Sequence, residues 1–142
     1  MTQINKTAQV PYSAEQMYQL VDDVEKYPDF LPWCSNVRIL RQMDAEVEAQ
    51  ISMALGKLQQ SFTTRNTGEP PVRLRMDLLE GPFQYLHGRW EFEPAGSGCR
   101  VSLDMDFEFK NKLVRMALGG AFNKIVNSLM SAFVQRAHQL YG

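Results

Sequence analysis

Residues that carry most metal and nucleophile chemistry are scarce in this chain. The 142 residues include two cysteines, Cys34 and Cys99, and two histidines, His87 and His138, spread along the sequence. Metal sites need such side chains in clusters, disulfide scaffolds need many cysteines, and no Gly-rich phosphate loop is present. We therefore expect no metal site, no disulfide framework and reduced, at least partly buried thiols.

Long apolar runs are also missing. The N-terminal residues lack the apolar core of a signal peptide. The most apolar stretch, residues 116–133, is interrupted by Asn123, Lys124 and Asn127, which argues against a transmembrane span. We expect a cytoplasmic protein, and the length fits a single domain over residues 1–142 with one core.

Charge is nearly balanced overall but unevenly distributed. The net charge is −1, so no global field favours nucleic acid, and we expect no DNA partner. Every acidic residue lies before residue 109, whereas residues 109–142 contain only bases: Lys110, Lys112, Arg115, Lys124 and Arg136. Such asymmetry is typical of a segment that meets an anionic partner. Alternatively, the two parts neutralise each other in the fold.

Strand-like patterns occupy most of the chain, at residues 3–10, 36–42, 46–55, 58–66, 72–79, 83–93 and 99–109. The last run alternates apolar and polar residues strictly, which predicts a strand with one buried and one wet face. Ser13 lies three residues before Gln16, a capping-box spacing that predicts a helix ending near Asp23. Pro28 and Pro32 permit at most a short second helix between them. Short connections favour antiparallel neighbours.

The C-terminal segment is predicted to be a long amphipathic helix. From Gly120 onward its apolar residues share one face, but Leu113, Val114 and Ala117 point elsewhere. Glycine is unfavourable inside a helix, so Gly119-Gly120 indicates a kink, a break or an overhang where the phase changes. The alternative is one helix whose first turns extend past the sheet.

Together these elements predict an α+β fold. An antiparallel sheet of about seven strands, apolar on one face, would curl around the C-terminal helix, with two small helices after the first strand. The space between sheet and helix is either a cavity or a filled core.

The inward faces carry almost no ionisable group, whereas general acid–base catalysis needs one within reach of the substrate. Asp104, Asp106, Glu108 and His87 should point outward by strand parity. Val47, Leu55, Leu74 and Val101 should face inward. We therefore expect binding of an apolar small molecule, not catalysis. The candidate ligand-binding residues are Phe30, Trp33, Ile51, Met53, Phe62, Met76, Leu78, Phe83, Trp90, Phe92, Leu103, Met105, Phe107, Phe122, Val126, Leu129 and Phe133.

Three blocks of sequence resemble a known family. They are residues 23–34 (DVEKYPDFLPWC), residues 81–92 around Gly81-Pro82-Phe83 and Gly88-Arg89-Trp90, and Ala132-Phe133 with Arg136-Ala137. The chain resembles the START-like, helix-grip superfamily, in its branch of coenzyme Q-binding and polyketide cyclase-like proteins, and most of all the bacterial ribosome-association toxin RatA group. The similarity spans almost the whole chain.

The resemblance implies two functions. One is binding of ubiquinone or another polyprenyl lipid between sheet and helix, linked to respiration, with access near Gly119-Gly120 and no required cofactor. The other is a toxin that binds the large ribosomal subunit and blocks subunit joining and translation. Lys110, Lys112 and Arg115, at a helix N-terminus, are the candidate contacts for rRNA phosphates or lipid head groups. A transient membrane contact is a further expectation.

Overall fold

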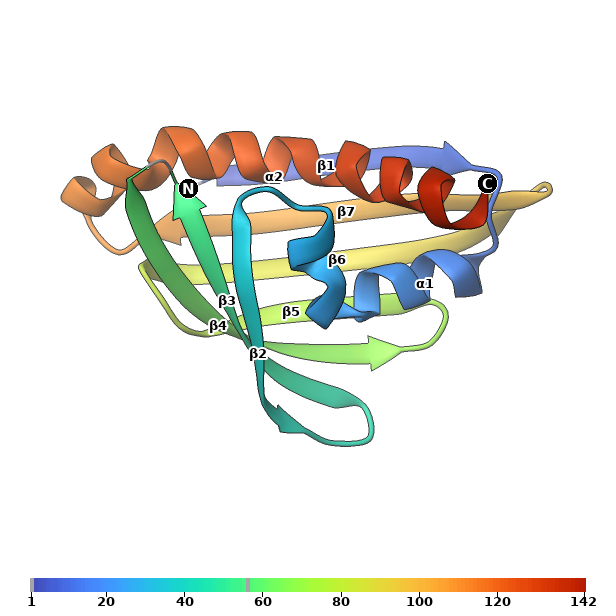
Figure 1. Cartoon of the computed structure of the whole chain (residues 1–142), viewed down its shortest axis with the longest axis horizontal. Coiled ribbons are helices and arrows are strands. Elements are labelled where there is room, and N and C mark those ends of the chain that lie inside the picture. The colour runs from blue at the N-terminus through green and yellow to red at the C-terminus, as the bar shows by residue number, and fades with distance from the viewer. Residues whose placement is uncertain (1, 56) are drawn as a thin grey trace.

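The computed structural model describes residues 2–55 and 57–142, apart from the side chain of Leu55, so the expectation that Leu55 faces inward lies outside the described residues. The elements are β1 (Thr2–Val10), α1 (Ala14–Asp22), the 3-10 helix η1 (Val24–Asp29), β2 (Cys34–Gln42), β3 (Glu46–Leu55), β4 (Leu58–Glu69), β5 (Arg73–Glu80), β6 (Phe83–Ala95), β7 (Gly98–Phe109) and α2 (Lys112–Tyr141) (Figure 1). The predicted α+β fold is confirmed. β4 and β6 extend a few residues further than predicted.

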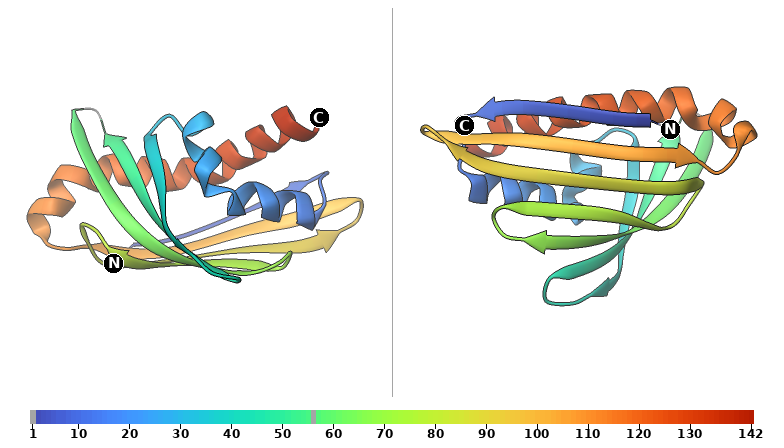
Figure 2. Two further views of the ribbon diagram at one scale, coloured as in Figure 1. Left: turned by 60° about the horizontal axis from the view of Figure 1, so that its bottom comes forward. Right: turned by 180° about the vertical axis from the view of Figure 1, so that it is seen from behind.

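The strands form one antiparallel sheet in the order β1-β7-β6-β5-β4-β3-β2. The first strand pairs with the last, from Thr2 opposite Phe107 to Val10 opposite Cys99. Gly98 permits this pairing at the β6–β7 turn, because a Cβ there would lie 1.8 Å from the Val10 carbonyl oxygen. The sheet curves strongly, and α1, η1 and α2 all lie on its concave side (Figure 2).

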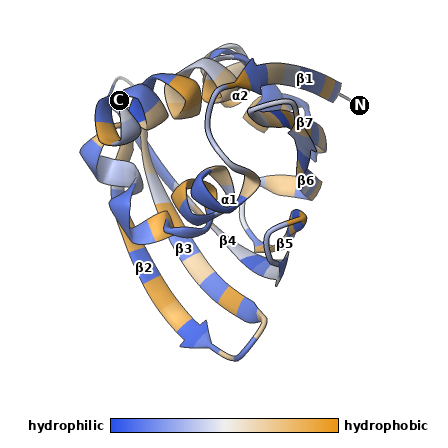
Figure 3. Ribbon diagram, turned by 90° about the vertical axis from the view of Figure 1, so that its right-hand side faces the viewer, coloured by the Kyte–Doolittle hydropathy of each residue, from blue (hydrophilic) through white to orange (hydrophobic). Residues whose placement is uncertain are grey.

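Alternation along the strands sorts side chains between the two faces, as predicted. In β7, Val101, Leu103 and Phe107 are fully buried, while Asp104 and Asp106 are partly exposed on the other face. Apolar and polar segments also alternate along β2 and β3 (Figure 3). The concave face therefore forms the core, together with the apolar sides of the helices.

The predicted capping box starts α1. The Gln16 amide donates to Ser13 Oγ at 3.1 Å, and the Ser13 amide donates to Gln16 Oε1 at 2.9 Å. The second short helix lies earlier than expected, because η1 ends at Asp29 and contains Pro28. Proline has no amide hydrogen to donate, so Pro28, the fifth of six residues, leaves one hydrogen bond of this short helix unformed near its end.

The predicted break at Gly119-Gly120 is wrong, because α2 is one continuous helix. The predicted overhang is confirmed, because the first turns of α2 extend past the sheet (Figure 1). Leu113 is 78% exposed, Val114 is partly buried against the core, and full burial begins at Leu118, which is 4% exposed. The change of apolar phase in the sequence therefore marks where the helix meets the core. Asn111 caps this overhang, since its Oδ1 accepts a hydrogen bond from the Val114 amide at 2.9 Å.

Candidate functional site

A small apolar cavity lies between the concave face of the sheet and α2. Its volume is about 50 Å³. Side chains from η1, the loop before β2, strands β3 to β7 and α2 enclose it. The lining residues are Tyr27, Trp33, Ile51, Phe62, Thr64, Met76, Leu86, Trp90, Met105, Phe122, Ile125, Val126, Leu129 and Phe133. Pockets for small molecules usually measure roughly 300–1,000 Å³, so this interior is closer to a filled core than to an open receptor.

Aromatic rings occupy most of the space between helix and sheet. Phe133 of α2 is 2% exposed. Its ring meets those of Tyr27, Phe30 and Trp90 edge-on, at centroid distances of 5.3, 5.2 and 5.1 Å. Nearer the start of the helix, Phe122 packs against phenylalanines of β6 and β7. These contacts clamp α2 onto the sheet and leave little free volume.

One polar side chain in the lining was missed by the sequence reasoning. Thr64 is 1% exposed, and its hydroxyl donates to Asn66 Oδ1 at 2.9 Å. The signal was present, because Phe62, Thr64 and Asn66 share the strand parity that places them on one face. Because β4 is polar along most of its length, its hydrophobic pattern did not identify Thr64 and Asn66 as inward-facing.

Tyr27 is the titratable residue of the cavity lining. Its hydroxyl donates to the Val21 carbonyl oxygen, and burial raises the pKa of Tyr27 far above its usual range. Among the described residues, the lining contains no carboxylate, imidazole, amine or thiol. A phenol that stays protonated and already hydrogen-bonded is a poor general acid or base.

The structure brings only some of the predicted ligand-binding residues together at the cavity. Those on its lining are Trp33, Ile51, Phe62, Met76, Trp90, Met105, Phe122, Val126, Leu129 and Phe133. Those buried elsewhere in the core are Met53, Phe83, Phe92, Leu103 and Phe107, while Leu78 is partly buried. Tyr27, Leu86 and Ile125 were missed along with Thr64. The predicted access near Gly119-Gly120 is not supported, because the helix is unbroken there and Gly119 is buried.

Phe30, predicted inside the site, instead lines an external groove of about 470 Å³ between η1, the loop that follows it, and the C-terminal half of α2. The Arg136 guanidinium carbon lies 5.2 Å from the centre of the Phe30 ring, a cation–π contact. Arg136 Nε is buried and has no hydrogen-bond partner among the described residues. Two blocks of the family resemblance, far apart in sequence, therefore meet at this groove.

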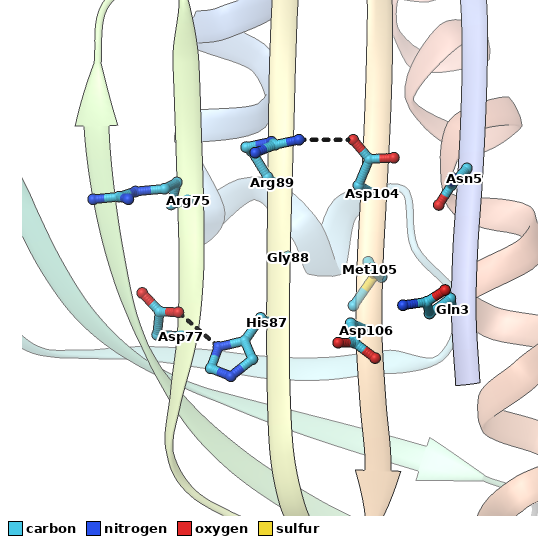
Figure 4. A pocket seen from close by; sticks show the side chains of 10 residues that line it. All are labelled: Gln3, Asn5, Arg75, Asp77, His87, Gly88, Arg89, Asp104, Met105 and Asp106. Carbon is cyan, nitrogen blue, oxygen red and sulfur yellow. Dashed lines mark hydrogen bonds and ion pairs between the residues drawn. The ribbon is translucent and has the colours of Figure 1, made fainter. Parts of the chain in front are cut away.

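The convex face of the sheet carries a shallow depression of about 350 Å³ lined by charged side chains (Figure 4). His87 Nδ1 lies 2.8 Å from Asp77 Oδ1, and Arg89 Nη2 lies 3.4 Å from Asp104 Oδ2. The expectation that His87 and the β7 carboxylates point outward is confirmed. These are an exposed hydrogen bond and an exposed ion pair, and surface contacts of this kind contribute little in water.

Of the three basic residues predicted to contact an anionic partner, two are exposed without an ion pair among the described residues and one pairs with an acid. Lys110 and Lys112 are exposed, but Arg115 Nη1 lies 3.7 Å from Glu108 Oε1. That pairing with an acid of β7 fits the neutralisation alternative for this one residue. The Asn111 cap also occupies one amide of the helix N-terminus.

Neither thiol is activated. Cys34 is buried, and burial raises its pKa to about 11, although a backbone hydrogen bond to Asn36 acts in the opposite direction. Burial also raises the pKa of Cys99. Within residues 2–55 and 57–142, no group of three or more His, Cys, Asp or Glu side chains could hold a metal ion. In the same residues, no helix is both long and apolar enough to cross a bilayer.

Comparison with known proteins gives consistent matches. Residues 10–134 match the family described as polyketide cyclase / dehydrase and lipid transport. The chain is 42% identical over 142 residues to the ribosome association toxin RatA of Pseudomonas aeruginosa, covering 99% of each chain. It is 28% identical over 136 residues to the mitochondrial coenzyme Q-binding protein COQ10 homolog B of Xenopus laevis, covering 92% of this chain and 56% of that protein. A START superfamily protein of Mycobacterium smegmatis has the same fold, with a TM-score of 0.80, 21% identity and coverage of 97% and 98%.

Proposed function

This chain belongs to the polyketide cyclase / dehydrase and lipid transport family, and from that premise we propose that it is a non-catalytic protein that associates with the ribosome. The observation that carries the proposal is the 42% identity to a ribosome association toxin over nearly the full length of both chains. Its action would be to bind the large subunit and prevent subunit joining, in keeping with the family resemblance.

A binding function is supported by the interior of the fold. Some members of a family described as cyclases and dehydrases must move protons, which requires titratable groups near the substrate. The cavity lining here offers Tyr27 alone, and its hydroxyl is held by the Val21 carbonyl. The volume of about 50 Å³ also leaves no room for a polyketide.

Lys110 and Lys112 are the proposed contacts with rRNA phosphates. Both are exposed beside an overhanging helix whose sequence has no acidic residue. Arg115 would contribute less, because Glu108 already offsets its charge. Contacts of this kind lose affinity steeply as salt displaces them.

Co-sedimentation with purified large ribosomal subunits tests the proposal. We expect binding that weakens strongly between about 50 and about 200 mM salt. The double variant Lys110→Glu and Lys112→Glu should lose it, whereas Lys26→Glu with Arg38→Glu, the same charge change at exposed sites elsewhere, should not. Absence of binding at low salt, or equal loss in both double variants, would contradict the proposal.

A second candidate function is binding of a polyprenyl lipid such as ubiquinone, favoured by the apolar lining of the cavity. Each methylene buried there would contribute roughly 0.8 kcal/mol. The cavity must first widen, because about 50 Å³ holds no isoprenoid chain. Trp33 and Leu129 are partly exposed on its lining, so widening would begin between the β2 side and α2.

Thermal shift with a short-chain ubiquinone tests this second function. The Leu129→Trp substitution should fill the cavity and abolish the shift, while Ser131→Trp, exposed on the same helix, should leave it unchanged. No shift in the unsubstituted protein, together with organic extracts free of lipid, would exclude it.

A further inference from the structure

The end of the molecule formed by the first turns of α2 exposes two large apolar side chains. Leu113 is 78% exposed and Met116 is 73% exposed, more than any other large apolar side chain of the described residues. They are three residues apart, so they are neighbours on the same side of the helix. The tip of the β3–β4 hairpin lies at the same end (Figures 1 and 2), and there Leu58 is 44% exposed.

Exposed lysines lie at the same end of the molecule, with Lys110 and Lys112 beside the start of α2 and Lys57 at the β3–β4 hairpin tip. Lys57, Lys110 and Lys112 are exposed, and none forms an ion pair within the described part of the chain. The acids at this end are Glu108, which pairs with Arg115, and Glu80, the last residue of β5 before the turn whose Pro82 carbonyl accepts a hydrogen bond from the Lys110 amide. The end therefore carries a net positive charge around an apolar centre.

We propose that this end, defined by Lys57, Leu58, Lys110, Lys112, Leu113 and Met116 and called the docking end, binds the surface of an anionic phospholipid bilayer. An amphipathic helix at a bilayer interface gains from both features at once, because apolar side chains enter the acyl boundary while lysines remain among the anionic head groups. RNA phosphates would use the lysines but offer little to Leu113 and Met116.

The first turns of α2 could contact a bilayer without a change in the fold. The overhanging turns of α2 are held by the Asn111 cap and by the burial of the helix from Leu118 onward, so they project without needing to unfold. The next turns of the same helix carry Phe122 and Ile125 into the cavity lining. Docking would place the cavity near the acyl region of the membrane.

The lysines of the docking end are those proposed to contact rRNA, so a bilayer and a ribosomal subunit would compete for the protein. The apolar residues separate the two interactions. Replacing Leu113 and Met116 should weaken bilayer binding and leave ribosome association intact. Replacing Lys110 and Lys112 should weaken both.

Co-sedimentation with vesicles tests the inference. Phosphatidylcholine vesicles serve as the neutral surface, and mixed phosphatidylcholine and phosphatidylglycerol vesicles serve as the anionic one. We expect binding to the mixed vesicles, with a partition coefficient that falls about tenfold for each apolar residue lost and roughly fivefold for each lysine lost. The variant pair is Leu113→Ser with Met116→Ser.

A matched control is Leu40→Ser with Met43→Ser, which removes an exposed leucine and methionine, 48% and 41% exposed, near the β2–β3 turn. It should bind vesicles like the unsubstituted protein. The inference is overturned if the mixed vesicles do not bind at low salt, if neutral vesicles bind equally well, or if both double variants behave alike. Loss of ribosome co-sedimentation in Leu113→Ser with Met116→Ser would instead assign these side chains to the ribosome contact and also overturn it.

Discussion

Removing the ring of Phe133 should release the helix from the sheet. Phe133 is 2% exposed and meets three aromatic rings, those of Tyr27, Phe30 and Trp90. A buried Phe→Ala change costs about 3–5 kcal/mol. Here the new void would join the existing cavity of about 50 Å³, which limits relaxation of the surroundings, so we expect the upper part of that range. Such a loss is a large fraction of the roughly 5–15 kcal/mol that stabilises a typical domain.

Urea denaturation followed by far-UV circular dichroism measures this change. Leu113→Ala, on the same helix but 78% exposed, is the matched control and should change stability by no more than about 0.5 kcal/mol. The enlarged apolar space should also bind benzene, as dry engineered cavities do. A loss of unfolding free energy below about 1.5 kcal/mol for Phe133→Ala is well short of the range for a buried phenylalanine. It would refute the view that this ring cluster holds α2 against the sheet. So would a comparable loss in the control.

Three further predictions concern the sheet and the interior. Gly98→Ala should reduce the free energy of unfolding by more than about 2 kcal/mol in urea denaturation, because the added Cβ would lie 1.8 Å from the Val10 carbonyl oxygen. An alanine tolerated without loss would show that this approach of β1 is not required. Thr64→Val should cost about 1–3 kcal/mol by the same measurement, since it leaves the buried Asn66 without its donor; unchanged stability would mean that the amide finds another partner. Burial raises the pKa of Tyr27, so the folded state keeps a proton that the unfolded state releases above about pH 10. Stability should therefore fall as pH rises beyond that point, by about 1.4 kcal/mol per unit, and the slope should be shallower in Tyr27→Phe; equal slopes would contradict the assignment.

Much of the fold could be predicted because strand periodicity is local. The alternation from Cys99 to Phe109 depends only on successive side chains pointing to opposite faces, so the buried set of β7 followed directly from the sequence. The same reasoning placed His87 and Asp104 outside. The Ser13 and Gln16 spacing predicted the start of α1, because the capping box is closed within one helical turn.

The candidate site was harder to predict, because lining a cavity depends on how several elements meet. Strand parity identifies an inward face but does not separate Trp90, at the cavity, from Leu103, which is buried elsewhere in the core. Thr64 was passed over because a polar strand conceals its inward members. Phe30 left the predicted site because η1 and the following loop turn its ring toward Arg136.

The sequence by itself determined the elements, the two faces of the sheet and the exclusion of charged groups from the interior, because these follow from local periodicity and hydrophobicity. Only the tertiary structure decided that aromatic rings nearly fill the space under α2, since packed volume is a property of many distant residues together. It also decided why the apolar residues before Gly119 lie on a different side of the helix from those after it. Here α2 continues unbroken beyond the sheet, so Leu113 and Met116 lie in solvent while Val114 still packs against the core.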